Sequence, residues 1–247
     1  MLAGLGFRAW APNQRGYGQS SRPAKVADYA LDRLVEDAAA LVDVSGTRST
    51  VLIAHDWGGV VAWAFAARRT RPLDALIVLN MPHPICFRRA LGRWRQLRKS
   101  WYIGAFQIPW LPDRLLALGR GRMVQSILHG SSVSRAAFPR EIVDVYRDQA
   151  RAPGVATAML AWYRAAIRGG WGRLLTGLDR VIDTPTLVIW GQDDIALDEI
   201  TLEGTERYVS DLTIRRLPGV SHWVQQDAPD AVNALIAEFL KSKGIAA

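Results

Sequence analysis

The segment from Val51 to Val60 constrains the fold more than any other part of this chain. Four apolar residues, Val-Leu-Ile-Ala, lead through His-Asp-Trp-Gly-Gly into a helical run. Small residues stand two positions before and two positions after the central Asp56, at Ala54 and Gly58, as they do where strand and helix backbones approach closely. The pattern predicts a buried strand, a tight turn that exposes Asp56, and a helix: a nucleophile elbow. The alternative is an aspartate that caps the helix N-terminus, but capping does not require small residues on both sides.

Apolar runs alternate with helical patterns on both sides of the elbow. The expected strands are 7–11, 51–54, 73–79, 186–190 and 213–217, and the expected helices include 31–42, 60–69 and 229–240. Such alternation predicts an α/β fold with a mostly parallel sheet covered by helices. Residues 82–178 show no clear strand and are dense in Trp and Arg, so we expect an all-α lid there. The core is then formed by 1–81 and 179–247.

Composition limits the class of protein. Of the 247 residues, 49% are hydrophobic and 22% charged, and Cys86 is the one cysteine. These values exclude a disordered chain, a disulfide scaffold and a multi-cysteine metal site. No apolar run approaches the roughly 20 residues of a membrane span, and the start lacks a signal peptide's basic leader and long apolar stretch. We therefore expect a cytoplasmic protein.

The net charge of +8 is unevenly distributed. Residues 82–180 contain 17 Lys and Arg against 5 Asp and Glu, whereas the remainder contains 14 against 18. The basic amphipathic run 87–101 is compatible with contact to an anionic membrane surface, and a solvated arginine-rich surface is the alternative. No groove-reading motif accompanies the charge, so a nucleic-acid partner is not expected. The sequence leaves the oligomeric state open.

An aspartate nucleophile restricts the chemistry. Attack of a carboxylate on an ester or amide gives an anhydride that readily reverts, whereas attack on a saturated carbon with a leaving group gives a stable ester. Water can then hydrolyse that ester at the aspartate's own carbonyl carbon. The substrate is therefore expected to be an epoxide or an alkyl halide.

Ester hydrolysis needs a general base, and the chain has four histidines. His55 is on a strand that points it away from Asp56, and His83 and His129 lie at or inside the lid. We expect His222 to be the base, because it follows the last strand and so lies at the sheet edge of the elbow. Its orienting acid is expected to be Asp194, with Asp193 as second choice. The order nucleophile, acid, histidine is that of an α/β-hydrolase triad.

Several segments together resemble the epoxide hydrolases of the α/β-hydrolase superfamily. They are Ala11-Pro-Asn-Gln-Arg-Gly-Tyr-Gly-Gln-Ser20, His55-Asp-Trp-Gly-Gly59, Asn80-Met-Pro-His-Pro84, and the loops Asp194–Leu197 and Gly219–Trp223. Asn13 stands where the family usually has an aspartate. The matches cover nearly the whole chain. The resemblance implies hydrolysis of a small lipophilic epoxide to a vicinal diol through an Asp56 ester, with water as second substrate and with neither cofactor nor metal.

The leaving group separates epoxide from halide. An epoxide oxygen needs a proton, and a phenol stays protonated at neutral pH. Tyr102, before Phe-Gln, and Tyr163, in Trp-Tyr-Arg, stand where the resemblance implies the family's two lid tyrosines. Two packing aromatics are the alternative. Trp57 does not discriminate, because dehalogenases use a tryptophan there for halide. Dehalogenation thus remains the second candidate reaction.

One family motif is absent. Epoxide hydrolases carry His-Gly-x-Pro after an early strand, and its backbone N–H forms an oxyanion hole with the N–H of Trp57. The only His-Gly here is His129-Gly130, inside the lid. The family's first three strands are also missing. We therefore expect that Met1 is not the natural start of the functional protein, and a catalytically impaired fragment is the alternative.

Overall fold

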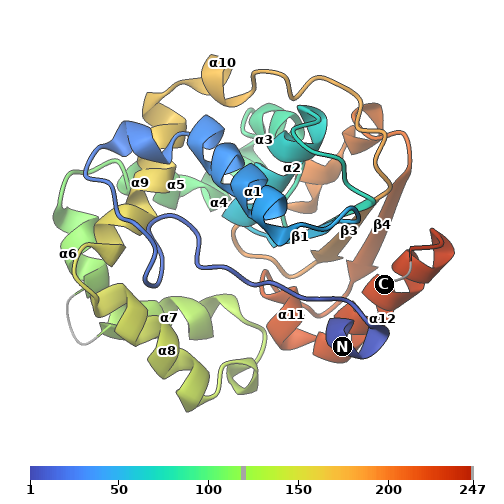
Figure 1. The fold of residues 1–247 in the computed structure, drawn as a ribbon. Coiled ribbons are helices and arrows are strands. Elements are labelled where there is room, and N and C mark those ends of the chain that lie inside the picture. Colours follow the sequence, from blue (N-terminus) through green and yellow to red (C-terminus); the bar gives the residue numbers. More distant parts are fainter. Residues whose placement is uncertain (118–120, 246–247) are drawn as a thin grey trace.

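The computed structural model describes residues 1–117 and 121–245, and the strands in those ranges form one parallel sheet (Figure 1). In spatial order the strands are β1 (Val51–His55), β2 (Ala75–Leu79), β3 (Thr186–Gly191) and β4 (Leu212–Leu217). Every neighbouring pair is parallel, with Val51 opposite Ala75, Leu76 opposite Thr186, and Thr186 opposite Leu212. The predicted α/β fold is confirmed, and all three sequence loops expected to carry the triad follow strands of this sheet.

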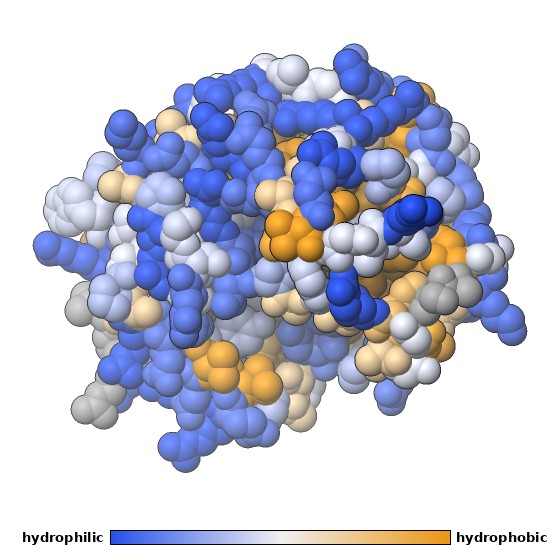
Figure 2. Space-filling model, in the orientation of Figure 1, coloured by the Kyte–Doolittle hydropathy of each residue, from blue (hydrophilic) through white to orange (hydrophobic). Residues whose placement is uncertain are grey.

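Burial differs from strand to strand. β2 and β3 contain no charged residue and are buried along their whole length, as central parallel strands are. β1 lies at the edge of the sheet and is only half-buried. Figure 2 shows a hydrophobic patch over the region where helix α1 (Leu31–Ser45) and β1 lie in Figure 1, among mostly hydrophilic surroundings. The strand that leads to Asp56 is therefore less covered than its neighbours β2 and β3.

The predicted strand at 7–11 is wrong. Residues 7–14 are in neither helix nor strand, and the Trp10 side chain is 49% exposed. A short apolar run favours extended backbone, but a strand forms only when its N–H and C=O groups pair with a neighbour. The Phe7 side chain is partly buried and packs against the core cluster formed with helix α12 (Pro229–Ser242).

Helices cover both faces of the sheet. On one face α1 (Leu31–Ser45) and α2 (Trp57–Ala67) enclose the largest core cluster, and on the other α11 (Val224–Asp227) and α12 (Pro229–Ser242) enclose a second. Alternate residues of β2 serve the two clusters: Leu76 and Val78 point into the first, Ile77 and Leu79 into the second. Because successive side chains of a strand point to opposite faces, β2 packs against the helices on both sides of the sheet.

The described part of 82–178 contains helices and no strand, and we refer to these helices as the lid. Its helices are α3 (Pro84–Ala90), α4 (Trp94–Lys99), α5 (Trp101–Ala105), α6 (Leu111–Ala117), α7 (Arg122–Ser131), α8 (Arg140–Arg151), α9 (Val155–Arg168) and α10 (Trp171–Leu174). A separate core cluster that includes Leu116, Leu128, Phe138 and Leu160 holds several of them together. Throughout the two described ranges, each helix is too short or too polar to cross a membrane.

Candidate active site

Asp56 sits at a sharp turn between β1 and α2. Its backbone has φ 50° and ψ −128°, in a region that non-glycine residues rarely adopt. The side chain makes no capping hydrogen bond to α2 and is 37% exposed. The structure therefore has a strained turn with an accessible carboxylate, and the helix-capping alternative is not realised.

Close packing around the elbow is tightest at Gly59. A Cβ built on this residue would lie 2.6 Å from Cβ of Met81, which is closer than real contacts allow. A Cβ on Gly58 would meet Cβ of Ala54 at 3.8 Å, an ordinary contact, and Nε2 of Gln14 at 3.3 Å. The sequence pattern predicted that Ala54 and Gly58 must be small. In the structure, Gly59 has less space for a side chain than Gly58 has.

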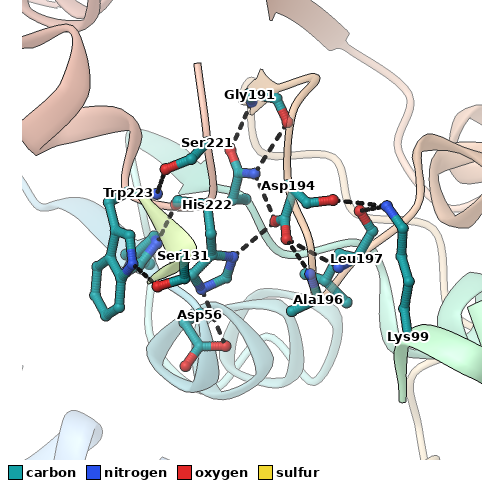
Figure 3. Close-up of polar contacts among 12 residues, drawn as sticks. Asp56, Lys99, Ser131, Gly191, Asp194, Ala196, Leu197, Ser221, His222 and Trp223 are labelled. Carbon is teal, nitrogen blue, oxygen red and sulfur yellow. Dashed lines mark hydrogen bonds and ion pairs between the residues drawn. The ribbon is translucent and has the colours of Figure 1, made fainter. Parts of the chain in front are cut away.

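The structure brings Asp56, Asp194 and His222 together, from the loops after β1, β3 and β4 (Figure 3). Nδ1 of His222 lies 2.7 Å from Oδ2 of Asp194, a hydrogen bond, and Nε2 lies 3.7 Å from Oδ1 of Asp56. Because a carboxylate only accepts, Nδ1 carries the proton when the ring is neutral. The free Nε2 then faces the Asp56 carboxylate.

Asp194 is held by several donors at once. Besides His222, it accepts hydrogen bonds from Nδ2 of Asn80 at 2.8 Å and from the backbone N–H groups of Ala196 at 2.7 Å and Leu197 at 2.9 Å. Burial by itself favours a higher pKa, but the charge of His222 and these hydrogen bonds outweigh it and hold the pKa of Asp194 below its ordinary value. Asp193 is exposed. Of the two candidate acids, Asp194 is the one that contacts the histidine.

Asn80 connects two strand ends. It is fully buried directly after β2, with a positive φ of 36° that asparagine tolerates better than most residues. Its Oδ1 accepts the N–H of Gly191 at 2.7 Å, while its Nδ2 donates to Asp194. Gly191 itself must be glycine, since a Cβ there would lie 2.1 Å from the carbonyl oxygen of Ser221. The histidine loop therefore passes directly over the end of β3.

Two histidines in the site have opposite pKa shifts. Burial by itself lowers the pKa of His222, but the negative charges of Asp194 and Asp56 and the bond to Asp194 outweigh it and raise the pKa. Burial and the neighbouring His222 lower the pKa of His55 to about 4. His55 is thus neutral, and its Nε2 donates to the carbonyl oxygen of His222 at 2.8 Å. His55 therefore supports the loop that carries His222.

The remaining histidines lie elsewhere. His83 is fully buried, stacks on Tyr208 with ring centroids 4.5 Å apart, and is kept neutral by burial, which lowers its pKa to about 4. Nε2 of His129 lies 3.2 Å from the carbonyl oxygen of Phe138, inside the lid. Neither contacts Asp56, so His222 is the histidine whose free ring nitrogen faces the carboxylate.

The two predicted lid tyrosines lie together beside the elbow. Tyr163 packs edge-on against Trp57 with ring centroids 4.9 Å apart, and the ring centroids of Tyr102 and Tyr163 are 6.1 Å apart. Burial and the charge of Asp56 raise the pKa of both phenols. Both therefore stay protonated at neutral pH, close enough to the carboxylate to sense its charge.

Lid residues are bonded to the loops of the acid and the histidine. Nζ of Lys99 on α4 donates to the carbonyl oxygen of Asp194 at 2.6 Å (Figure 3). At the end of α7, Oγ of Ser131 accepts the indole N–H of Trp223 at 2.7 Å, next to His222. Each loop is therefore fixed on one side by the sheet and on the other by the lid.

Sequence reasoning missed three residues of the site: Asn80, His55 as a support for His222, and Tyr17. The pKa of Tyr17 is raised by burial and by the charge of Asp56, so its phenol shares the environment of the two lid tyrosines. Tyr17 and Asn80 lie within motifs that carry the resemblance. Only the fold brings their side chains to the carboxylates.

A family model described as the alpha/beta hydrolase fold matches residues 1–229. The chain belongs to the α/β-hydrolase family. It is 34% identical over 243 residues to the AB hydrolase superfamily protein YfhM of Bacillus subtilis, which covers 98% of this chain and 83% of YfhM. The predicted membership of this superfamily is confirmed.

Within this α/β-hydrolase family the similarities include epoxide hydrolases. The chain is 34% identical to human Epoxide hydrolase 4, over 96% of this chain and 66% of that protein. The crystal structure of Bacillus megaterium epoxide hydrolase in complex with an inhibitor superposes with a TM-score of 0.84 at 29% identity, over 92% of this chain and 82% of that one. The chain spans 58–66% of the length of the curated epoxide hydrolases from Caenorhabditis elegans and human.

Proposed function

We propose that the chain is an epoxide hydrolase that converts an epoxide to a vicinal diol through a covalent ester on Asp56. The observation that carries this proposal is that one accessible carboxylate is flanked by both partners the reaction needs. A histidine nitrogen lies 3.7 Å from it, and the charge of Asp56 raises the pKa of two buried phenols. The epoxide hydrolase relatives support the same reaction.

In the first half-reaction, a carboxylate oxygen of Asp56 attacks an epoxide carbon and the carbon–oxygen bond of the ring breaks. The freed oxygen takes a proton from Tyr102 or Tyr163. Raised pKa values keep both phenols in the acid form that this step needs. General acid catalysis of this kind contributes roughly 10²–10⁴ in rate.

In the second half-reaction, Nε2 of His222 takes a proton from water, and the resulting hydroxide attacks the carbonyl carbon of the Asp56 ester. The imidazolium that forms is stabilised by Asp194 at Nδ1. As the tetrahedral intermediate breaks down, its hydroxyl proton passes to the departing alkoxide, which frees the diol and the Asp56 carboxylate. The proton on the imidazolium returns to the phenolate and restores both side chains. The backbone N–H of Trp57, at the start of α2, is the donor we assign to the oxyanion.

Halide release is less well supported. A departing halide is stabilised by N–H donors, and Trp57, directly after Asp56, carries an indole N–H. In this structure the Trp57 ring packs edge-on against Tyr163, and the charge of Asp56 raises the pKa of both Tyr102 and Tyr163. Two protonated phenols beside the carboxylate favour proton donation to an epoxide oxygen over release of a halide.

The experiment that tests the ester mechanism uses His222→Gln with styrene oxide. Alkylation should proceed while ester hydrolysis stalls, so intact mass should increase by one substrate, with the adduct on Asp56. His129→Gln is the matched control and should turn over normally. In wild type, a single turnover in ¹⁸O water should place label in the Asp56 carboxylate. An inactive His222 variant without adduct, or label only in the diol, would contradict the mechanism.

A further inference from the structure

Helix α4 has its apolar side facing solvent. On α4, the Trp94 side chain is 74% exposed and that of Leu97 is 51% exposed. Trp101, the first residue of α5, is 73% exposed. We call Trp94, Leu97 and Trp101 the tryptophan patch. Large apolar side chains exposed together on a helix are costly in water, and they mark a surface that contacts something else.

The opposite side of α4 is polar and faces the protein. Gln96 is fully buried: it donates to the carbonyl oxygen of Ala196 at 3.0 Å and accepts the N–H of Asp198 at 2.7 Å. Lys99 donates to the carbonyl oxygens of Asp194 and Leu197. These bonds fix the rotation of the helix, so the tryptophan patch cannot turn inward without breaking them.

The segment that carries the tryptophan patch is rich in basic residues. Residues 84–117 contain seven Lys and Arg and a single acid, Asp113, which is paired with the buried Arg164. Arg93 and Arg95 pair with Glu203 and Asp198 of the core. Arg98 is exposed and forms no ion pair within the described residues. Arg98 lies four residues after Trp94 and three before Trp101, a spacing that places side chains on the same side of a helix.

We propose that the tryptophan patch and Arg98 bind peripherally to an anionic lipid surface. Tryptophan is enriched at membrane interfaces, because its ring is amphipathic, and arginine is attracted by the negative potential of anionic headgroups. A second copy of this chain is a poorer occupant. A two-fold interface centred on the tryptophan patch would bring Arg98 of one copy near Arg98 of the other, and like charges repel.

The location of the tryptophan patch connects it to the site. Trp101 and Tyr102 are adjacent on α5, yet the first is exposed and the second lies beside Tyr163 near the elbow. A lipid surface at the patch would therefore lie one residue away from a side chain of the candidate site. The binding itself does not depend on the proposed function.

The test is cosedimentation of the full chain with vesicles of phosphatidylcholine and phosphatidylglycerol, roughly three to one, at about 0.1 M salt. Binding should exceed that to phosphatidylcholine alone and should decrease as salt is raised. Arg98→Ala should weaken partitioning about five-fold, the value of one basic residue near such a surface. Trp94→Ser with Trp101→Ser should weaken it about ten-fold or more.

Matched controls use equally exposed positions elsewhere. Arg140→Ala, on α8 with a side chain 93% exposed, and Val44→Ser, on α1 and 77% exposed, should leave partitioning unchanged. Circular dichroism verifies that each variant is folded. The proposal is overturned if the wild type does not bind anionic vesicles, or if patch and control variants bind alike. A concentration-dependent dimer that the patch substitutions dissociate, without vesicle binding, would overturn it in favour of self-association.

Discussion

The two halves of the candidate site differ in how firmly they are held. On the acid and histidine side, the side chain of Asp194 is 0% exposed and that of His222 is 9% exposed. Asp194 is bonded to Asn80 and, through its carbonyl oxygen, to Lys99 of the lid, and His222 is bonded to Asp194 and His55. On the nucleophile side, Asp56 is 37% exposed, follows a half-buried edge strand, and makes no capping bond.

This difference matches two chemical tasks. A base must be oriented before water arrives, because its tautomer and ring position decide which proton it can take. A nucleophile must instead be reached by substrate and must change its bonding during the reaction. We therefore expect substitutions at Asp56 to affect chemistry but not stability, whereas substitutions around Asp194 should affect both.

The largest effect is expected for Asp56→Asn. An amide is a poor nucleophile, so turnover of an aryl epoxide should fall by roughly 10⁴ or more, while the melting temperature stays within about 2 °C because no hydrogen bond to α2 is lost. Asp193→Asn, at an exposed aspartate, is the control and should retain full activity. A large loss of stability in Asp56→Asn would remove the contrast between the two halves.

The tyrosines come next. Tyr102→Phe and Tyr163→Phe should each slow epoxide opening, and the double variant should lose roughly 10²–10⁴ in the alkylation rate. Tyr146→Phe, on the lid helix α8, is the matched control. Unchanged epoxide opening in the double variant, or halide release by the parent that exceeds epoxide opening, would move the function to dehalogenation.

Asn80→Ala tests the firmly held half. It removes one donor to Asp194 and leaves the N–H of Gly191 without its acceptor. Losing the partner of a buried hydrogen bond costs roughly 1–3 kcal/mol. Ester hydrolysis should therefore slow about five- to 150-fold, and the melting temperature should fall. Because the pKa of Asp194 should rise, the pH profile of ester hydrolysis should shift as well. A lower melting temperature with an unmoved pH profile would assign Asn80 a structural role only.

Gly59→Ala tests the packing below the nucleophile. A Cβ there meets Met81 at 2.6 Å, so we expect a loss of about 1–3 kcal/mol in the free energy of unfolding, measured by urea denaturation. Gly172→Ala, on α10 with nothing within 4 Å of the new Cβ, should be neutral or slightly stabilising. Equal effects of the two substitutions would show that the elbow is not sterically restricted at Gly59.

The smallest effect is a difference in titration. His55 and His222 have ring centroids 4.6 Å apart, yet the pKa of His55 is lowered to about 4 and that of His222 is raised above its ordinary 6.5. Ester hydrolysis needs neutral His222, so its rate should rise with pH through a value above 6.5. His55 should stay neutral down to about pH 4. NMR titration of the imidazole C–H signals distinguishes them, and a common midpoint near 6.5 would contradict both shifts.

Local patterns were sufficient for most of the sheet and for the order of the triad. The runs at 51–54, 73–79, 186–190 and 213–217 all lie in or around observed strands. The central strands β2 and β3 are uncharged, as buried parallel strands require, whereas 213–217 contains Arg215 and Arg216 and lies in the edge strand β4. The run at 7–11 is also apolar, but it has no partner strand in the structure. Whether a strand finds a partner depends on the whole fold and not on the local sequence. Asn80 was missed for the same reason: its partner Asp194 is 114 residues away.

The bonds between the lid and the loops of Asp194 and His222 affect how substrate can enter the enzyme and how product can leave it. Lys99 and Gln96 tie α4 to the acid loop, and Ser131 ties α7 to Trp223. A lid that lifted as one rigid piece would have to break these bonds and would loosen the loops of Asp194 and His222 each time a molecule entered or left. Under the proposed function, such an opening would couple the exchange of substrate and product to a transient loss of catalytic competence. Entry by small local displacements of the lid helices would avoid this and would keep the site ready for hydrolysis while ligands exchange.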